Sequence, residues 1–260
     1  MRGMNLSNTR STNPAIGVME RAAGTFNFGG EGADANAATV SGTTTKSLLL
    51  IALTLVVGWF SMNYAIGYYM QSGGAMPSGL IFGSMLVGVI VAFVTIFKPQ
   101  YAPITAPLYA VCEGACLGAF SGYCEFLYQG VVSTAVMATF VVVMVMLALW
   151  KFHIIVPTQR FRAIVTGATV AVCLLYLLNF VFSLFGATLL PTSGSVSIGI
   201  SLVICLIAAL NLVLDFDQIQ VCVDRGLPKY FEFYNAFSLL VTILWLYIEI
   251  LNLLMKARDN

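Results

Sequence analysis

Long apolar runs alternate with short polar or Pro/Gly segments from Ser47 onward. A membrane-spanning helix needs about 20 apolar residues, and seven of these runs reach that length. We expect helices at residues 47–70, 79–97, 104–126, 130–150, 163–186, 196–219 and 231–255. The runs are too long and too uniformly apolar for the alternating strands of a membrane barrel. The pattern therefore predicts an all-α membrane protein with seven transmembrane helices.

The segment before Ser47 has a different character. Residues 1–45 are rich in Gly, Ala, Asn, Ser and Thr and contain no sustained apolar run. Such a segment buries too little apolar surface to fold alone, and a signal peptide would need an apolar stretch close to its start. We therefore expect a disordered cytoplasmic arm at residues 1–45 and a transmembrane domain at residues 46–260.

Composition agrees with a membrane protein and limits the partners. The chain is 59% hydrophobic and only 9% charged, which is far from the average of soluble domains. Its net charge of +1 provides no basic surface for nucleic acid. Membrane lipid is the partner that the composition indicates, and nucleic acid is excluded.

The basic residues predict the orientation. Ten of the twelve fall on one side of the predicted topology, which the positive-inside rule makes cytoplasmic. These ten are Arg2, Arg10, Arg21, Lys46, Lys98, Lys151, Arg160, Arg162, Arg225 and Lys229. Lys256 and Arg258 fall on the other side; a re-entrant last segment would bring them back, but its length favours a full crossing. The N-terminus is therefore expected in the cytoplasm.

Two aspartates, Asp215 and Asp217, stand near the cytoplasmic end of the sixth predicted helix. A charged carboxylate at membrane depth costs a few kcal/mol, so it is expected to be paired, protonated or in contact with water. At about 100° per residue the two side chains lie roughly 200° apart and cannot share a face. The simpler alternative is that both mark the frayed end of this helix.

Other polar residues in the spans are further candidates. Glu113 lies about 12 Å from the cytoplasmic end of the third helix, and its alternative is a protonated acid bonded to a backbone carbonyl. Glu249 lies toward the outer end of the last helix, where we expect an anchor facing the interface. Asn179 and Asn211 could lock helices together or face a water-filled path.

Glycines of the third span indicate close helix packing. Gly114, Gly118 and Gly122 recur every fourth residue, the spacing that lets helix backbones approach each other in membranes. The spacing alone leaves open whether the partner helix belongs to the same chain or to a second copy. We favour the same chain.

The order of several segments resembles a known family. LNLVLDFDQI followed by FYNAFSLLVTILWLYIEILNLL resembles the end of the Bax inhibitor family, also called the transmembrane Bax inhibitor motif family, which includes bacterial YccA-like members. EGACLGAFSGYCEF is similar to its third span, and STNPAIG together with DFDQI resembles one bacterial subgroup. The resemblance covers about residues 13–258. It implies seven helices with the last one central to the bundle, and a bacterial inner (plasma) membrane.

The resemblance also implies site residues. In family members that are pH-sensitive calcium leaks, an aspartate near the end of the sixth span pairs with an aspartate in the seventh, and protonation of the pair controls opening. Asp215 matches the first position, with Asp217 as a competitor, and Thr242 stands where the second is expected. Glu249 is too far along its helix to replace it. Glu113 could supply the second carboxylate.

Two functions fit these residues. The first is a regulated cation leak with calcium as the favoured ion, in which Asp215 is the gate, Glu113 a partner and Asp217 a ligand at the cytoplasmic mouth. The second is a non-conducting regulator of a membrane protease or of a cell-death or stress-pathway component. We expect no enzyme, because no G-x-S-x-G segment exists and His153 is the single histidine. Calcium and protons enter as permeant or regulating ions, and no cofactor is expected.

Overall fold

The computed structural model describes residues 37–186, 189, 191 and 194–259. Within these residues it consists of seven long helices, each apolar enough to cross a membrane, and one short 3-10 turn, η2 (Pro99–Tyr101). The helices are α2 (Val40–Gln71), α3 (Ser78–Phe97), α4 (Ala102–Leu127), α5 (Val131–Lys151), α6 (Gln159–Leu184), α7 (Ser195–Asp224) and α8 (Phe231–Asp259). The prediction of seven transmembrane helices is confirmed.

The first helix begins earlier than the sequence pattern indicates. Thr39 caps α2 by accepting a hydrogen bond from Gly42 N, and the hydroxyl of Thr43 bonds back to Thr39 O. Residues 40–45, which we assigned to the arm, are therefore helical. The apolar pattern did not indicate this first turn, because the hydropathy of its threonines is low. Their side chains nevertheless favour the start of a helix by capping it. Residues 1–36 lie outside the described residues.

The sixth predicted helix, α7, ends later than expected. It continues to Asp224 and stops in a Schellman motif, in which Gly226 N donates to Val223 O and Leu227 N donates to Cys222 O. Gly226 takes the left-handed φ of 60° that this motif requires. Asp215 and Asp217 thus lie inside a regular helix, so the interpretation as a frayed end is wrong.

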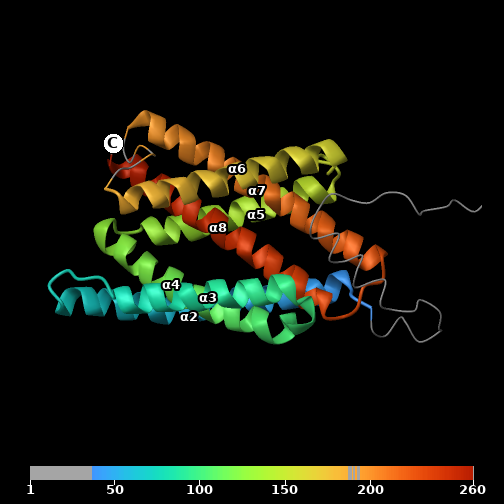
Figure 1. The fold of residues 1–260 in the computed structure, drawn as a ribbon, viewed down its shortest axis with the longest axis horizontal. Coiled ribbons are helices and arrows are strands. Elements are labelled where there is room, and N and C mark those ends of the chain that lie inside the picture. The colour runs from blue at the N-terminus through green and yellow to red at the C-terminus, as the bar shows by residue number, and fades with distance from the viewer. Residues whose placement is uncertain (1–36, 187–188, 190, 192–193, 260) are drawn as a thin grey trace, which may run out of the picture.

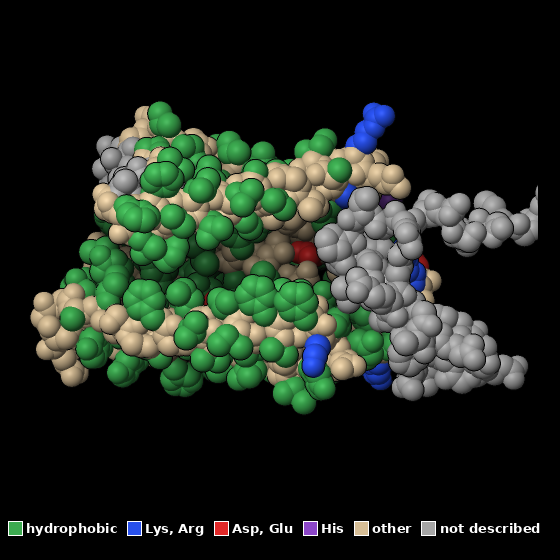
Figure 2. Space-filling model, in the orientation of Figure 1, with side chains coloured by type: hydrophobic (Ala, Val, Ile, Leu, Met, Phe, Trp, Pro, Cys, Tyr) green, Lys and Arg blue, Asp and Glu red, His purple; other side chains and the backbone are tan. Residues whose placement is uncertain are grey.

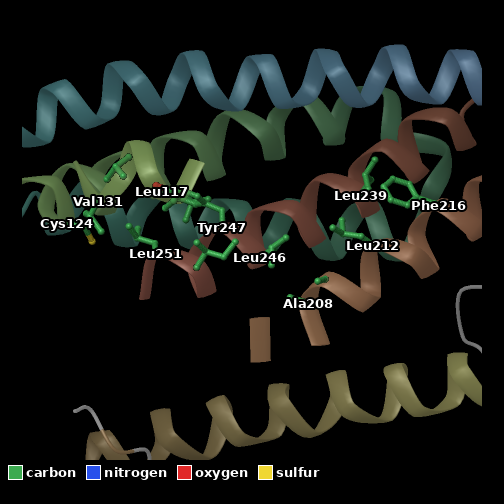
Figure 3. Packing of buried hydrophobic residues seen from close by; sticks show 14 residues of the cluster. Leu117, Cys124, Val131, Ala208, Leu212, Phe216, Leu239, Leu246, Tyr247 and Leu251 are labelled. Atoms are coloured by element: carbon green, nitrogen blue, oxygen red, sulfur yellow. The ribbon is translucent and has the colours of Figure 1, made fainter. Parts of the chain in front are cut away.

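The helices form two layers with α8 between them (Figure 1). One layer contains α2, α3 and α4, and the other contains α5, α6 and α7. The last helix packs against α2, α4, α5 and α7, whereas α6 packs mainly against α7. The largest apolar cluster, which includes Leu117, Val131, Leu212 and Leu246, joins α4, α5, α7 and α8 (Figure 3). The central position of the last helix is confirmed.

Glycines hold α4 against α2. A Cβ atom on Gly114 would lie 2.8 Å from Thr54 O, and one on Gly122 would lie 2.8 Å from Met62 O. A Cβ on Gly118 would collide with the backbone of Gly58. The glycine stripe therefore contacts a helix of the same chain, as favoured from the sequence.

Basic residues gather at one end of the bundle. The N-terminal ends of α2, α6 and α8 and the C-terminal ends of α3, α5 and α7 meet there, and the Lys and Arg side chains visible in Figure 2 lie at this end. We call it the basic end. Figure 2 also shows a hollow between the two layers, with an acidic side chain on its floor near the basic end.

Candidate functional site

A line of polar side chains runs along α8. The residues follow one another at intervals of three, four or seven positions, which places them on one face of a helix. They are Asn235, Ser238, Thr242, Trp245, Glu249 and Lys256, and we call them the polar stripe. Hydrogen bonds join the stripe to Asp215 and Ser201 of α7 and to Tyr176 of α6. The stripe as a whole was not predicted from the sequence, although the spacing of its residues could have revealed it.

Asp215 faces the stripe near the basic end. Ser238 Oγ donates a hydrogen bond of 2.8 Å to Asp215 Oδ1. The Thr242 hydroxyl, which donates to Ser238 O at 3.3 Å, lies beside the same carboxyl group. Asp215 Oδ2 is buried and accepts no full hydrogen bond from any of the described residues. The structure thus brings together the two residues that the family resemblance singled out, Asp215 and Thr242.

A second poorly satisfied polar group lies one turn closer to the basic end. Asn235 is 2% exposed, and within the described residues neither its amide nitrogen nor its amide oxygen makes a full hydrogen bond. The Cys222 thiol of α7 lies beside it and interacts weakly with its side chain. Cys222 lies beyond the predicted end of the sixth helix at residue 219, but it is buried because α7 continues to Asp224. Unpaired buried polar groups are few in native proteins, so two of them along one helix contact mark this seam as a candidate site.

Asp217 points away from this seam. It forms an ion pair with Arg162 of α6, and Arg162 Nε also donates to Pro157 O. The prediction that the two aspartates occupy different faces is confirmed. Asp217 therefore ties α7 to α6 at the basic end.

Glu113 is not brought to Asp215. It is half-buried in α4, where Tyr109 of the same helix donates a hydrogen bond to it. Its carboxylate lies next to Gly88 of α3, and a Cβ built on Gly88 would be 3.3 Å from Glu113 Oε1. Among the residues described, the contacts of Glu113 lie on α3 and α4 and those of Asp215 on α8. The structure thus gives Glu113 no contact that would make it the second carboxylate.

Glu249 is the largest departure from expectation. It is 2% exposed, and it accepts hydrogen bonds from Tyr176 Oη at 2.6 Å and from Trp245 Nε1 at 3.0 Å. The prediction of an anchor facing the interface is wrong, because the face on which Glu249 lies is turned toward α6 and α7. Position along a helix can be read from sequence, but the rotation of the helix depends on its packing.

The two asparagines have structural contacts. Asn211 Nδ2 donates to Thr169 Oγ1 of α6 at 2.7 Å and to Ile207 O at 2.8 Å. Asn179 Oδ1 accepts a hydrogen bond from Leu189 N in the segment between α6 and α7. Asn211 thus locks α7 to α6, which was one of its two expected roles.

Seven apolar helices, the last of which is central, define an integral, multi-pass membrane protein. The family described as Bax inhibitor 1 like matches residues 8–259, and the chain belongs to this family. Neither the search of curated proteins nor the search of solved structures gave a significant match.

Proposed function

We propose that this protein is a regulated cation leak, with calcium as the favoured ion and Asp215 as the group that faces the ion path. The observation that carries the proposal is the buried Asp215 Oδ2, which accepts no full hydrogen bond from the described part of the chain although it lies in a membrane-spanning helix. An ionisable residue within a membrane span is by default a candidate functional group.

The surroundings of Asp215 suit a hard cation. The carboxylate, the hydroxyls of Ser238 and Thr242 and the amide oxygen of Asn235 belong to one α7–α8 seam, and calcium prefers oxygen ligands. A proton competes with the cation for the same carboxylate, so flux should respond to pH. Thr242 stands at the position where the family resemblance implies a second aspartate. The response of the flux to pH should therefore follow the titration of a single carboxyl group.

The sidedness of the path follows from charge. The basic end should face the cytoplasm by the positive-inside rule, and we infer from this that Asp215 lies in the cytoplasmic half of what we propose is a bacterial inner membrane. Asp217, paired with Arg162, would then lie beside the path rather than in it.

The test is calcium entry into liposomes that contain the purified protein, followed from pH 6 to pH 8. Asp215→Asn should lower the flux at least about tenfold, which corresponds to ~1.4 kcal/mol. Asp217→Asn is the matched control, since it removes a charge two residues away on the other face, and it should retain most of the flux. Glu113→Gln should resemble this control.

Thr242→Asp sharpens the test. It would restore a pair of carboxylates at the positions of the family pair, and two such groups titrate as a coupled unit. Flux in this variant should depend more steeply on pH than flux in the wild type.

The same experiment also tests the second candidate function. Absence of flux at every pH, in protein shown to be folded and inserted, would contradict the leak. It would favour a non-conducting regulator of a membrane protease or of a stress or cell-death component, whose activity should survive Asp215→Asn.

A further inference from the structure

The polar stripe contains a second buried acid far from Asp215. Glu249 follows Thr242 by seven residues on the same face of α8, about 10 Å farther from the basic end at 1.5 Å per residue. The cation path proposed above makes no use of it. Nevertheless, it is among the most deeply buried polar side chains of the described part of the chain.

Neutral donors surround this carboxylate. Tyr176 of α6 and Trp245 of α8 both donate a hydrogen bond to Oε1 of Glu249. Cys205 of α7 is the other titratable group beside it. The contacts that hold Glu249 are therefore made by groups that carry no positive charge at neutral pH.

The nearest cation does not pair with it directly. Lys256 lies seven residues farther along α8 and acts on Glu249 only through the electric field, while its ammonium group donates to Ser201 Oγ at 2.8 Å. The two salt bridges found in the described residues are Lys46–Glu232 and Arg162–Asp217. A buried carboxylate without a contact ion pair can lose its charge by binding a proton.

We propose that Glu249 is a proton-binding site in the half of the bundle opposite the basic end. The proton comes from water at that end and converts the carboxylate to a carboxylic acid. Hydrogen bonds to a neutral acid are weaker than those to a carboxylate, so proton binding loosens the Tyr176–Glu249 contact between α6 and α8. The site does not require that the protein conducts cations.

Trp245 provides a direct probe of this site. The chain has three tryptophans, and Trp59→Phe with Trp150→Phe leaves Trp245 as the single emitter beside Glu249. In this background, purified protein in lipid nanodiscs should show a sigmoidal change of tryptophan emission with pH. Glu249→Gln should abolish the change, whereas Asp215→Asn should leave it intact.

A second variant keeps the test informative if Glu249→Gln fails to fold. Tyr176→Phe removes one donor to the ionised carboxylate and should move the midpoint of the titration to higher pH by about one unit. An emission that is independent of pH in the single-tryptophan protein, a titration that persists in Glu249→Gln, or a midpoint unchanged by Tyr176→Phe would each overturn the proposal. The emission titration does not depend on the liposome flux assay. The proposed cation leak and the proposed proton site can therefore be contradicted independently.

Discussion

The contact between α2 and α4 and the contact between α6, α7 and α8 hold helices together in different ways. In the first, Gly114, Gly118 and Gly122 let the backbone of α4 lie directly on α2. In the second, polar side chains such as Tyr176 and Asn211 bridge the helices. Lipid tails are as apolar as helix surfaces, so association in a membrane relies on close packing or on hydrogen bonds. The α2–α4 contact relies mainly on close backbone packing, to which Ser61 Oγ adds a hydrogen bond to Ala115 O, whereas the contacts of α6, α7 and α8 rely on bonds between side chains.

The two contacts differ in what can change them. A backbone contact through glycines has no titratable group and one well-packed arrangement, so it is permanent under ordinary conditions. A contact through a carboxylate and hydroxyls responds to protons and cations. The glycine side thus acts as a fixed support, and the polar side is the part that can move.

Gly118→Ala should have the largest effect on stability. The new Cβ would meet the backbone atoms of Gly58, which cannot rotate away, so we expect a loss of about 3 kcal/mol or failure to fold. Unfolding of the purified protein in mixed micelles measures this. Gly83→Ala is the matched control, because nothing lies within 4 Å of a Cβ at Gly83 in α3. Equal stabilities of the two variants would remove the distinction between the two sides.

Lys46→Met should have the second-largest effect on stability. It tests whether the burial of a polar contact determines its contribution to stability more than its polar character does. Lys46 pairs with Glu232, which is 1% exposed and also accepts hydrogen bonds from Thr39 N and Oγ1 at 2.9 Å. Leaving this carboxylate without its cation should cost about 2 kcal/mol. Lys229→Met, a change of a nearby lysine without this ion pair, should cost much less in the same unfolding experiment. A similar loss in both would indicate general charge balance instead.

Tyr176→Phe should cost about 1 kcal/mol, since hydrogen bonds between membrane helices contribute roughly that amount. The variant removes only the hydroxyl that donates to Glu249. A loss as large as that of Gly118→Ala, measured under identical conditions, would show that the polar side is as rigid as the glycine side.

Asp217→Asn should have the smallest effect, about 0.5 kcal/mol, because its pair with Arg162 is partly exposed and such pairs contribute little. The difference from wild type should shrink in high salt. A loss that is insensitive to salt would mean that Asp217 carries more of the α6–α7 contact than its exposure indicates.

The sequence was sufficient for the seven helices because lipid requires long apolar runs, and these are visible directly. Helix ends were less predictable: capping by Thr39 and the Schellman motif at Gly226 extended α2 and α7 into polar segments. The second error mattered for the site, because the end of α7 determines whether Asp215 and Cys222 are interior or peripheral.

The candidate site was predictable in part. The opposite faces of Asp215 and Asp217 follow from helix geometry alone, and the position of Thr242 opposite Asp215 follows from the family resemblance. The partners of Glu113 and Glu249 depend on how each helix rotates against its neighbours. That rotation is set by the packing of many side chains, and no short segment encodes it.

The contacts that join the start of α2 to α8 at the basic end can form only after both helices have been synthesised. Glu232 of α8 lies 193 residues after Thr39 and 186 residues after Lys46, the two residues that bind its carboxylate. The hydrogen bond from Ala38 N to Leu227 O likewise depends on the segment just before α8. A nascent chain that stalls before α8 therefore cannot form the contacts that close this end of the bundle.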